Sequence, residues 1–187
     1  MTVRQPHAER VEAILRADVH RWRLLAIVAQ LSLPDCWIAA GFVRNAVWDA
    51  RHDRPPQPFS DDVDVIWFNA ANCDEKVDRD IEKELRAVDP AVRWSVKNQA
   101  RMHQRNGDRP YSSAVDAMRF WPETATAVAA RRVGDDECII ASSFGLDDLF
   151  TLTVRPAGRF RDEKRAIYEA RIRSKRWFER WPRLSEE

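Results

Sequence analysis

Apolar residues recur at helical spacing near the start of the chain. Leu24, Val28 and Leu31 follow one another every three or four residues, which gives the segment a broad apolar side. We therefore predict two helices, over residues 7–17 and 18–31, and expect them to cover a sheet with their apolar sides.

Short apolar segments that end at turn residues follow these helices. They predict strands over residues 36–40, 62–68 and 92–98. Between them, residues 42–50 and 74–88 place apolar side chains at helical spacing. The alternation of strand and helix predicts an α/β (α+β) fold, with a small mixed sheet flanked by helices.

The remainder of the chain shows weaker patterns. We predict a short helix that starts at Asn98, a helix with Ser112 or Ser113 as its N-cap, and a hairpin that turns at residues 134–136. Residues 159–181 contain no proline and predict one long helix. We accordingly expect a domain over residues 1–156 and a helical C-terminal extension of the same domain over residues 157–187.

Charge is distributed unevenly, although the formal net charge of the 187 residues is only +1. Residues 155–183 hold eleven Lys or Arg against four Asp or Glu. Trp177, Phe178 and Trp181 lie among these cations, and a basic surface with aromatic residues is what an RNA acceptor would meet, so an RNA-binding protein that uses this segment is one interpretation. The alternative is that the aromatic residues pack on the body of the protein while the cations remain solvated.

Cysteines, glycines and terminal segments exclude several classes of protein. The three cysteines are widely spaced, so we expect no disulfide framework and no zinc site. No P-loop, Rossmann or HExxH motif occurs in the sequence. The N-terminus lacks the apolar stretch of a signal peptide, and no apolar run approaches membrane-spanning length. We expect a cytoplasmic protein with no membrane partner.

Two carboxylates are the clearest chemical signal. Asp62 and Asp64 lie two residues apart on a predicted strand, so they share one face while Val63 and Val65 point into the core. Adjacent carboxylates repel each other unless a cation lies between them, and hard oxygen ligands suit Mg²⁺ or Mn²⁺. Asp61, in contrast, is expected to end the proline-rich loop 53–61.

A turn at Gly41 joins the first predicted strand to the helix over residues 42–50. The free N–H groups and the dipole of a helix N-terminus attract anions such as a triphosphate. A candidate phosphate site therefore precedes the acidic pair in the chain.

This order of motifs resembles the DNA polymerase β nucleotidyltransferase superfamily, whose signature is a strand, a Gly-Gly or Gly-Ser turn that opens a helix, and an Asp-x-Asp strand. The string GFVRN also looks like the VRD-type segment in the heads of tRNA nucleotidyltransferases. Through DDVDVIWF, VKNQARMH, DAMRFWPETATAV and FGLDDLF, residues 35–156 are similar to a branch of uncharacterised bacterial nucleotidyltransferase-like proteins.

The resemblance implies metal-dependent transfer of a nucleotidyl group from an NTP to a hydroxyl acceptor, either RNA or a small molecule. Asp62 and Asp64 would be the catalytic residues and the ligands of Mg²⁺ or Mn²⁺. The turn would hold the phosphates, where Arg44 either reaches the triphosphate or forms a structural salt bridge. The candidate nucleotide-binding residues are Gly41, Phe42, Arg44, Asn45, Lys97 and Asn98.

The sequence departs from the superfamily pattern in three places. Phe42 occupies the second small position of the turn, and Asn45 replaces an acid. The later strand that supplies a third carboxylate in the superfamily has no acid here, and Lys97 and Asn98 lie in its place. Either Lys97 neutralises phosphate directly, or the site is a catalytically silent nucleotide-binding or regulatory module.

Other acids are available as the base that activates the acceptor. The candidates are Asp116 and Glu123. Because a nucleotide needs a second wall for its base and sugar, we expect a cleft between the Asp strand and residues 98–123. Asn98, Arg101, Asp116 or Glu123 would face Asp64 across it.

Overall fold

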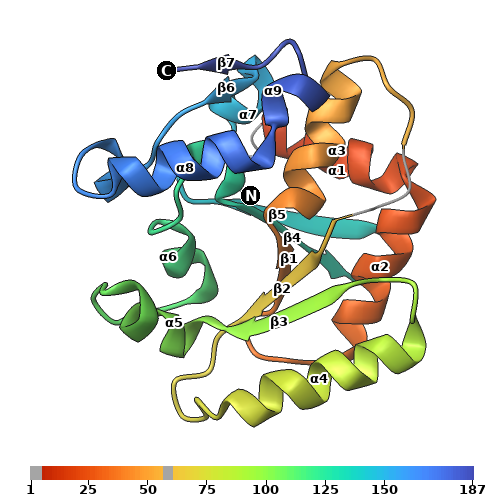
Figure 1. Ribbon diagram of the computed structural model, residues 1–187. Helices are drawn as coiled ribbons and strands as arrows, with labels where there is room; N and C mark the ends of the chain where they lie inside the picture. The colour runs from red at the N-terminus through yellow and green to blue at the C-terminus, as the bar shows by residue number, and fades with distance from the viewer. Residues whose placement is uncertain (1–5, 57–60) are drawn as a thin grey trace.

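The computed structural model describes residues 6–56 and 61–187 (Figure 1). Part of the predicted loop 53–61 therefore lies outside the described residues. A five-stranded sheet runs through the centre of the fold in the order β3-β2-β1-β4-β5. Its strands are β1 (Trp37–Ala39), β2 (Val63–Trp67), β3 (Trp94–Asn98), β4 (Val128–Val133) and β5 (Glu137–Ser142).

Strand pairing makes the sheet mixed. β1 is antiparallel to both β2 and β4, and β4 is antiparallel to β5. Within the described part of this five-stranded sheet, β2 and β3 are the one parallel pair, because α4 carries the chain between them. The predicted fold class, a small mixed sheet flanked by helices, is confirmed.

The main core joins the sheet to the four N-terminal helices. Ile38, Val65 and Val96 point from three neighbouring strands into this core and are fully buried. Apolar residues of every one of these helices join it, as their spacing predicts. The helices are α1 (Pro6–Ala17), α2 (Val19–Gln30), α3 (Gly41–Arg51) and α4 (Glu75–Val88).

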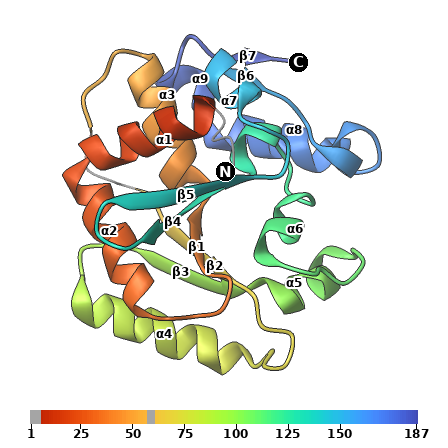
Figure 2. The ribbon, with the colours of Figure 1, turned by 180° about the vertical axis from the view of Figure 1, so that it is seen from behind.

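The other sheet face carries a smaller core and is only partly covered. Trp37, Ala39 and Ile66 of β1 and β2 pack there with Ala114 and Met118. The last two belong to α6 (Ala114–Met118), which follows α5 (Gln99–Asn106). Figures 1 and 2 show both short helices to one side of the sheet, away from α1 and α2.

Local capping signals correctly predicted these short helices. The side chain of Asn98 accepts a hydrogen bond from the N–H of Ala100 at 3.0 Å and caps α5. The hydroxyl of Ser113 accepts from the N–H of Asp116 at 2.9 Å and caps α6. The predicted hairpin is confirmed as well, since β4 and β5 are joined at residues 134–136.

The prediction of one long C-terminal helix is wrong. The segment contains the 3₁₀ turn η2 (Gly158–Arg161), α8 (Arg165–Lys175) and α9 (Trp177–Arg180). Arg176 interrupts the helix with a φ of 50°. The physical reason is tertiary: the break turns Trp177 and Trp181 onto Trp48, with ring centroids 5.5 and 5.1 Å away.

The remaining elements are the 3₁₀ turn η1 (Thr124–Thr126), α7 (Asp147–Thr151), β6 (Thr153–Val154) and β7 (Ser185–Glu186). Of these, α7, β6 and β7 lie near α9 in Figure 1. β7 pairs in parallel with β6, which the sequence did not predict. Within residues 6–56 and 61–187, no helix is both long and apolar enough to span a membrane.

Candidate functional site

Strand alternation places Asp64 as expected, whereas Asp62 lies just outside the strand. Val63 and Val65 are fully buried in the main core. Asp64 lies on the opposite face of β2, where it pairs with Ala39 of β1. Asp62 directly precedes the strand and is exposed, with an ion pair of 3.1 Å to Arg93.

Asp64 is in an environment that disfavours its charge. Burial raises its pKa above the ordinary 3.8, and the negative charge of Asp62 raises it further. The cations Arg44, Lys175 and Arg171 lower the pKa, but these effects are smaller than that of burial. A divalent cation between the two carboxylates would remove this penalty.

The turn before α3 differs from the predicted one by a single residue. Ala40, with φ 56° and ψ −122°, adopts a conformation that glycine prefers, and α3 begins at Gly41 without a side-chain cap. The two small residues of the turn are therefore Ala40 and Gly41, and Phe42 is not one of them. The Phe42 side chain is fully buried in the main core and lines neither pocket described below, so a contact of Phe42 with phosphate through its backbone N–H stays a prediction.

Ala40→Gly is expected to stabilise the protein by about 1 kcal/mol, since it releases part of the backbone strain. Thermal unfolding should show a rise in melting temperature of roughly 2–4 °C. The matched control is Ala50→Gly at an exposed position of α3, where glycine should cost about 0.5–1 kcal/mol. A lower melting temperature for Ala40→Gly would contradict the assigned strain.

Arg44 is buried next to the turn. Its guanidinium donates to the hydroxyl of Thr126 at 2.8 Å and to Oδ1 of Asn45 at 2.9 and 3.2 Å. The group also lies over the rings of Trp48 and Trp177, at 4.8 and 4.3 Å from their centroids. Burial lowers the pKa of Arg44 to about 10, so it remains protonated at neutral pH.

Asn45 connects Arg44 to Asp61. Its Nδ2 donates to Oδ2 of Asp61 at 2.8 Å, while its Oδ1 accepts from Arg44. The same oxygen of Asp61 lies 3.3 Å from an amino group of Arg180. The side chain of Asn45 is thus used within the protein, and its predicted contact with nucleotide stays untested. Asp61 does more than end a loop, because it orients side chains at the site.

A pocket of about 300 Å³ contains the acidic pair, and we call it the charged pocket. It brings Asp62 and Asp64 together with cations from the C-terminal segment. Sequence reasoning did not assign Asp61, Arg171, Lys175 or Arg180 to the site; the basic excess of residues 155–183 was the available signal. The lining residues are Ala40, Gly41, Arg44, Asp61, Asp62, Asp64, Arg171, Lys175, Trp177, Arg180 and Trp181.

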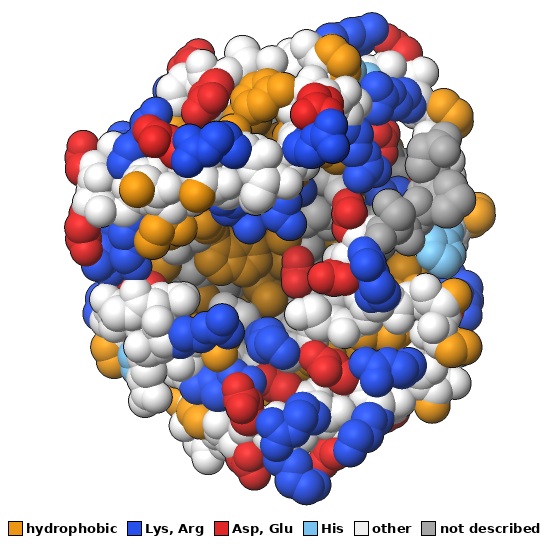
Figure 3. Space-filling model, in the orientation of Figure 1, with side chains coloured by type: hydrophobic (Ala, Val, Ile, Leu, Met, Phe, Trp, Pro, Cys, Tyr) orange, Lys and Arg blue, Asp and Glu red, His pale blue; other side chains and the backbone are white. Residues whose placement is uncertain are grey.

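A second pocket, of about 270 Å³, shares Ala40, Asp64 and Arg171 with the first. We call it the central cleft. Figure 3 shows a hollow below α8 with hydrophobic side chains on its floor, cations above and acids to one side. Its other lining residues are Val65, Ile66, Ser95, Lys97, Gln99, Met102, Asn106, Trp121, Pro122 and Thr126.

The central cleft lies where the sequence predicted one, between the Asp strand and the segment after residue 98. The residues that line it from that segment, however, are Gln99, Met102, Asn106, Trp121 and Pro122. The four residues predicted to face Asp64 do not line the central cleft, because their side chains form structural contacts elsewhere in the described part of the chain. These residues are Asn98, Arg101, Asp116 and Glu123.

Lys97 lies on the same sheet face as Asp64. Ser95 pairs with Asp64 and Lys97 with Ile66, and alternation sends all four side chains to one side. The ammonium group donates to Oε1 of Glu82 at 3.3 Å and to a main-chain carbonyl at 3.0 Å. Lys97 lines the central cleft with its charge already partnered, and its role toward phosphate stays a prediction.

Asn98 is removed from the candidate site. It pairs with Trp67 in the sheet, which places its side chain on the face opposite Asp64. Its Nδ2 donates to the carbonyls of Asn69 and Asn72, at 2.9 and 2.7 Å. Since its oxygen caps α5, the side chain is fully used in holding the loop after β2.

Neither candidate for the third acid reaches the central cleft. Asp116 forms two hydrogen bonds with Arg109, at 2.9 and 3.0 Å. Glu123 is fully buried, and its Oε1 accepts from Nε of Arg171 at 2.7 Å. Among residues 6–56 and 61–187, no group of three His, Cys, Asp or Glu side chains has the geometry of a metal site.

Two carboxylates fit a metal that obtains its other ligands from substrate and water. Mg²⁺ keeps several waters and is commonly held by one or two carboxylates plus phosphate oxygens. Asp62 and Asp64 provide such a donor set, because both carboxylates line the charged pocket. The same pair suits Mn²⁺.

Comparisons with known proteins agree with this geometry. Residues 26–185 match the family model described as Nucleotidyltransferase. A solved structure described as a CCA-adding enzyme head domain is 32% identical, with a TM-score of 0.85, and the match covers 96% of this chain and 95% of that one.

A more distant structure shows the fold alone. It is a CCA-adding enzyme in complex with CTP, 16% identical with a TM-score of 0.59, and the match covers 95% of this chain but 43% of that one. A search of curated proteins gave no match. The extent of the family match and the likeness to the head domain lead to one conclusion: the chain belongs to the nucleotidyltransferase family.

Proposed function

We propose that the protein transfers a nucleotidyl group from an NTP to a hydroxyl acceptor with the help of Mg²⁺ or Mn²⁺. The observation that carries this proposal is the position of Asp64, which lines both the charged pocket and the central cleft. A reaction between two substrates needs such a junction, where the phosphate of one meets the hydroxyl of the other.

The acidic pair, the start of α3 and Arg44 have different roles in the proposed reaction. Asp62 and Asp64 would hold the metal, which would supply charge to align the α-phosphate and to stabilise the leaving pyrophosphate. The start of α3 at Gly41 attracts phosphate through its N–H groups and dipole. Arg44, fixed by Thr126 and Asn45, adds a permanent positive charge behind the turn.

The central cleft provides space for the second reactant or for the nucleoside. Ile66, Met102 and Trp121 offer an apolar surface on which a base can stack, and Gln99 and Asn106 offer amide groups for hydrogen bonds. Because the two structural relatives are CCA-adding proteins, we propose CTP as the first nucleotide to test and an RNA 3′ end as the first acceptor. A small hydroxylated acceptor is the alternative.

A second candidate function is a silent nucleotide-binding module. It is favoured by one observation: within the described residues, neither pocket is lined by an acid other than Asp61, Asp62 and Asp64. Such a module would bind NTP and metal without turnover.

Pyrophosphate release separates the two functions. The protein would be incubated with each common NTP, Mg²⁺ or Mn²⁺, and an RNA acceptor that lacks its terminal CCA. We expect release that EDTA abolishes and a labelled product that migrates with the acceptor. Calorimetric binding of NTP without pyrophosphate release would support the silent module. If the protein neither binds an NTP nor releases pyrophosphate, both functions are rejected.

A further inference from the structure

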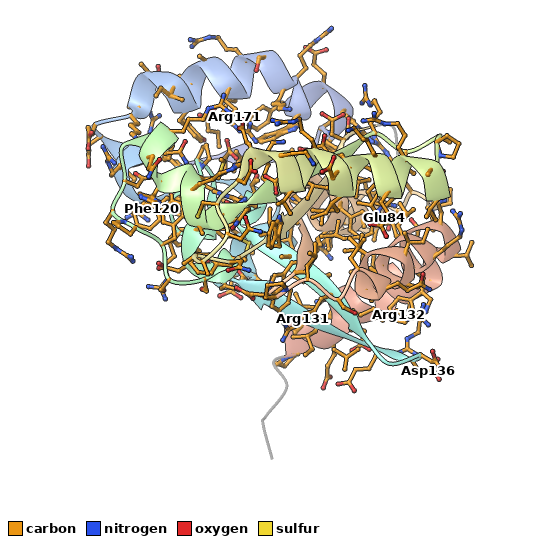
Figure 4. All side chains as sticks on the ribbon, turned by 90° about the horizontal axis from the view of Figure 1, so that it is seen from below. Glu84, Phe120, Arg131, Arg132, Asp136 and Arg171 are labelled. Carbon is orange, nitrogen blue, oxygen red and sulfur yellow. The ribbon has the colours of Figure 1, made fainter. Side chains whose placement is uncertain are left out.

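Two cations of α8 face the charged pocket because of their helical spacing. Arg171 and Lys175 are four residues apart, which places them on one side of the helix, and both line the pocket. Arg173 lies between them in sequence but points elsewhere, and it lines neither pocket described above. Figure 4 shows Arg171 on the side of α8 that faces the body of the protein.

A buried carboxylate holds Arg171 in place. Glu123 accepts from Nε of Arg171 at 2.7 Å and is fully buried. Its second oxygen has no hydrogen-bond partner in the described part of the chain. One edge of the Arg171 guanidinium is thus fixed, and the group lines both the charged pocket and the central cleft.

The other two cations complete one side of the charged pocket. Lys175 is exposed and has no carboxylate within 4 Å among the residues that the structure describes. Arg180 of α9 contacts Asp61 at 3.3 Å. We call Arg171, Lys175 and Arg180 the C-terminal cation wall, since all three line the pocket that contains the acidic pair.

The balance of charge indicates what this wall binds. The charged pocket has four cations, Arg44 and the three of the wall, against three carboxylates. A divalent metal on Asp62 and Asp64 would leave the pocket strongly positive. An NTP carries more negative charge than one such metal neutralises, and most of that charge is on its terminal phosphates.

We infer that the C-terminal cation wall binds the β- and γ-phosphates of the NTP, with Arg171 at the junction of the two pockets and Glu123 as its positioning residue. This inference rests on the proposed use of an NTP. It makes the C-terminal segment a part of the substrate site and predicts selectivity for triphosphates over monophosphates.

Inorganic tripolyphosphate with Mg²⁺ is a probe that does not depend on the base. In calorimetric titrations, Arg171→Ala and Lys175→Ala should each weaken its binding about tenfold, because each removes a charge-assisted contact. Binding of inorganic monophosphate should change by less than about twofold. Arg173→Ala, a control on the same helix, should leave both affinities unchanged.

Glu123→Gln tests the positioning role. It should weaken tripolyphosphate binding, and the double variant with Arg171→Ala should bind no more weakly than Arg171→Ala alone, since both changes act through one group. A merely structural role would lower the melting temperature and reduce mono- and tripolyphosphate binding alike. Lys175→Ala alters an exposed side chain and keeps the test valid if Glu123→Gln fails to fold.

The inference is overturned if tripolyphosphate does not bind, or if it binds Arg171→Ala and Lys175→Ala as tightly as the unaltered protein. If pyrophosphate release still depends on Asp64 in that case, the proposed function stands without the wall. Conversely, binding that depends on the wall, with no turnover of any NTP, supports the wall and favours the silent module.

Discussion

Asp64→Asn is expected to abolish nucleotidyl transfer and to raise the melting temperature of the free protein. Asn has about the volume of Asp but cannot hold a divalent cation with a full negative charge. Since a catalytic metal contributes several kcal/mol to the transition state, pyrophosphate release should fall by at least about a thousandfold.

The stabilising part of this prediction follows from the pKa of Asp64. Burial raises that pKa, so the folded state favours the protonated side chain. The stability that Asp64 contributes is fully present below its ordinary pKa of 3.8 and is lost as the pH rises through the raised value. At neutral pH the charged carboxylate opposes folding, and Asn removes this opposition.

Thermal unfolding at several pH values tests the linkage. The gain in melting temperature from Asp64→Asn should be largest at neutral pH and should shrink as the pH falls through the raised pKa. Asp116→Asn is the control for activity, because Asp116 is paired with Arg109 outside both pockets. If Asp116→Asn also loses most of its pyrophosphate release, Asp116 becomes the candidate for the catalytic base again. Pyrophosphate release by Asp64→Asn at the rate of the unaltered protein would refute the metal role of Asp64.

Trp181→Ala should produce the largest loss of stability, about 3–5 kcal/mol, as for other buried aromatic side chains. Trp181 is 1% exposed, and its indole packs at 5.1 Å from the Trp48 ring. The indole N–H also donates to Oδ1 of Asp49 at 2.7 Å, so truncation leaves a buried carboxylate without this donor.

Urea unfolding would measure the loss, with Trp181→Phe as the matched control. Phenylalanine keeps most of the ring packing and loses the hydrogen bond, so its cost should be smaller, about 1–3 kcal/mol. Because Trp181 also lines the charged pocket, its truncation should weaken binding of Mg²⁺ and tripolyphosphate. A cost below about 1 kcal/mol would show that Trp181 does not anchor the C-terminal segment.

Two differences between the predictions and the structure have a common physical origin. Asn98 was expected to contact nucleotide, but the parallel register of β2 and β3 sends its side chain to the opposite face. Arg176 occupies an interior position of a proline-free segment, yet it ends a helix with a positive φ because Trp177 and Trp181 pack on Trp48. In both cases a contact distant in sequence outweighed the local preference.

The turn at Ala40 shows a different kind of limit. The sequence predicted a turn at Gly41, but the positive φ of this turn is at Ala40, and alanine rarely adopts a positive φ. The main chain of Ala40 is nevertheless fixed by β4, since its N–H donates to the carbonyl of Val128 at 2.9 Å. A strand 88 positions later in the chain therefore holds this residue in a strained conformation.

The sequence by itself determined the local elements around the sheet: the four N-terminal helices with their apolar sides, the caps of α5 and α6, and the side of β2 on which Asp64 lies, because these depend on residues a few positions apart. Only the tertiary structure decided which cations meet those carboxylates. Arg180 and Asp61 are 119 residues apart in sequence and 3.3 Å apart in space. Such contacts arise when distant elements pack on a shared core, which no local pattern records.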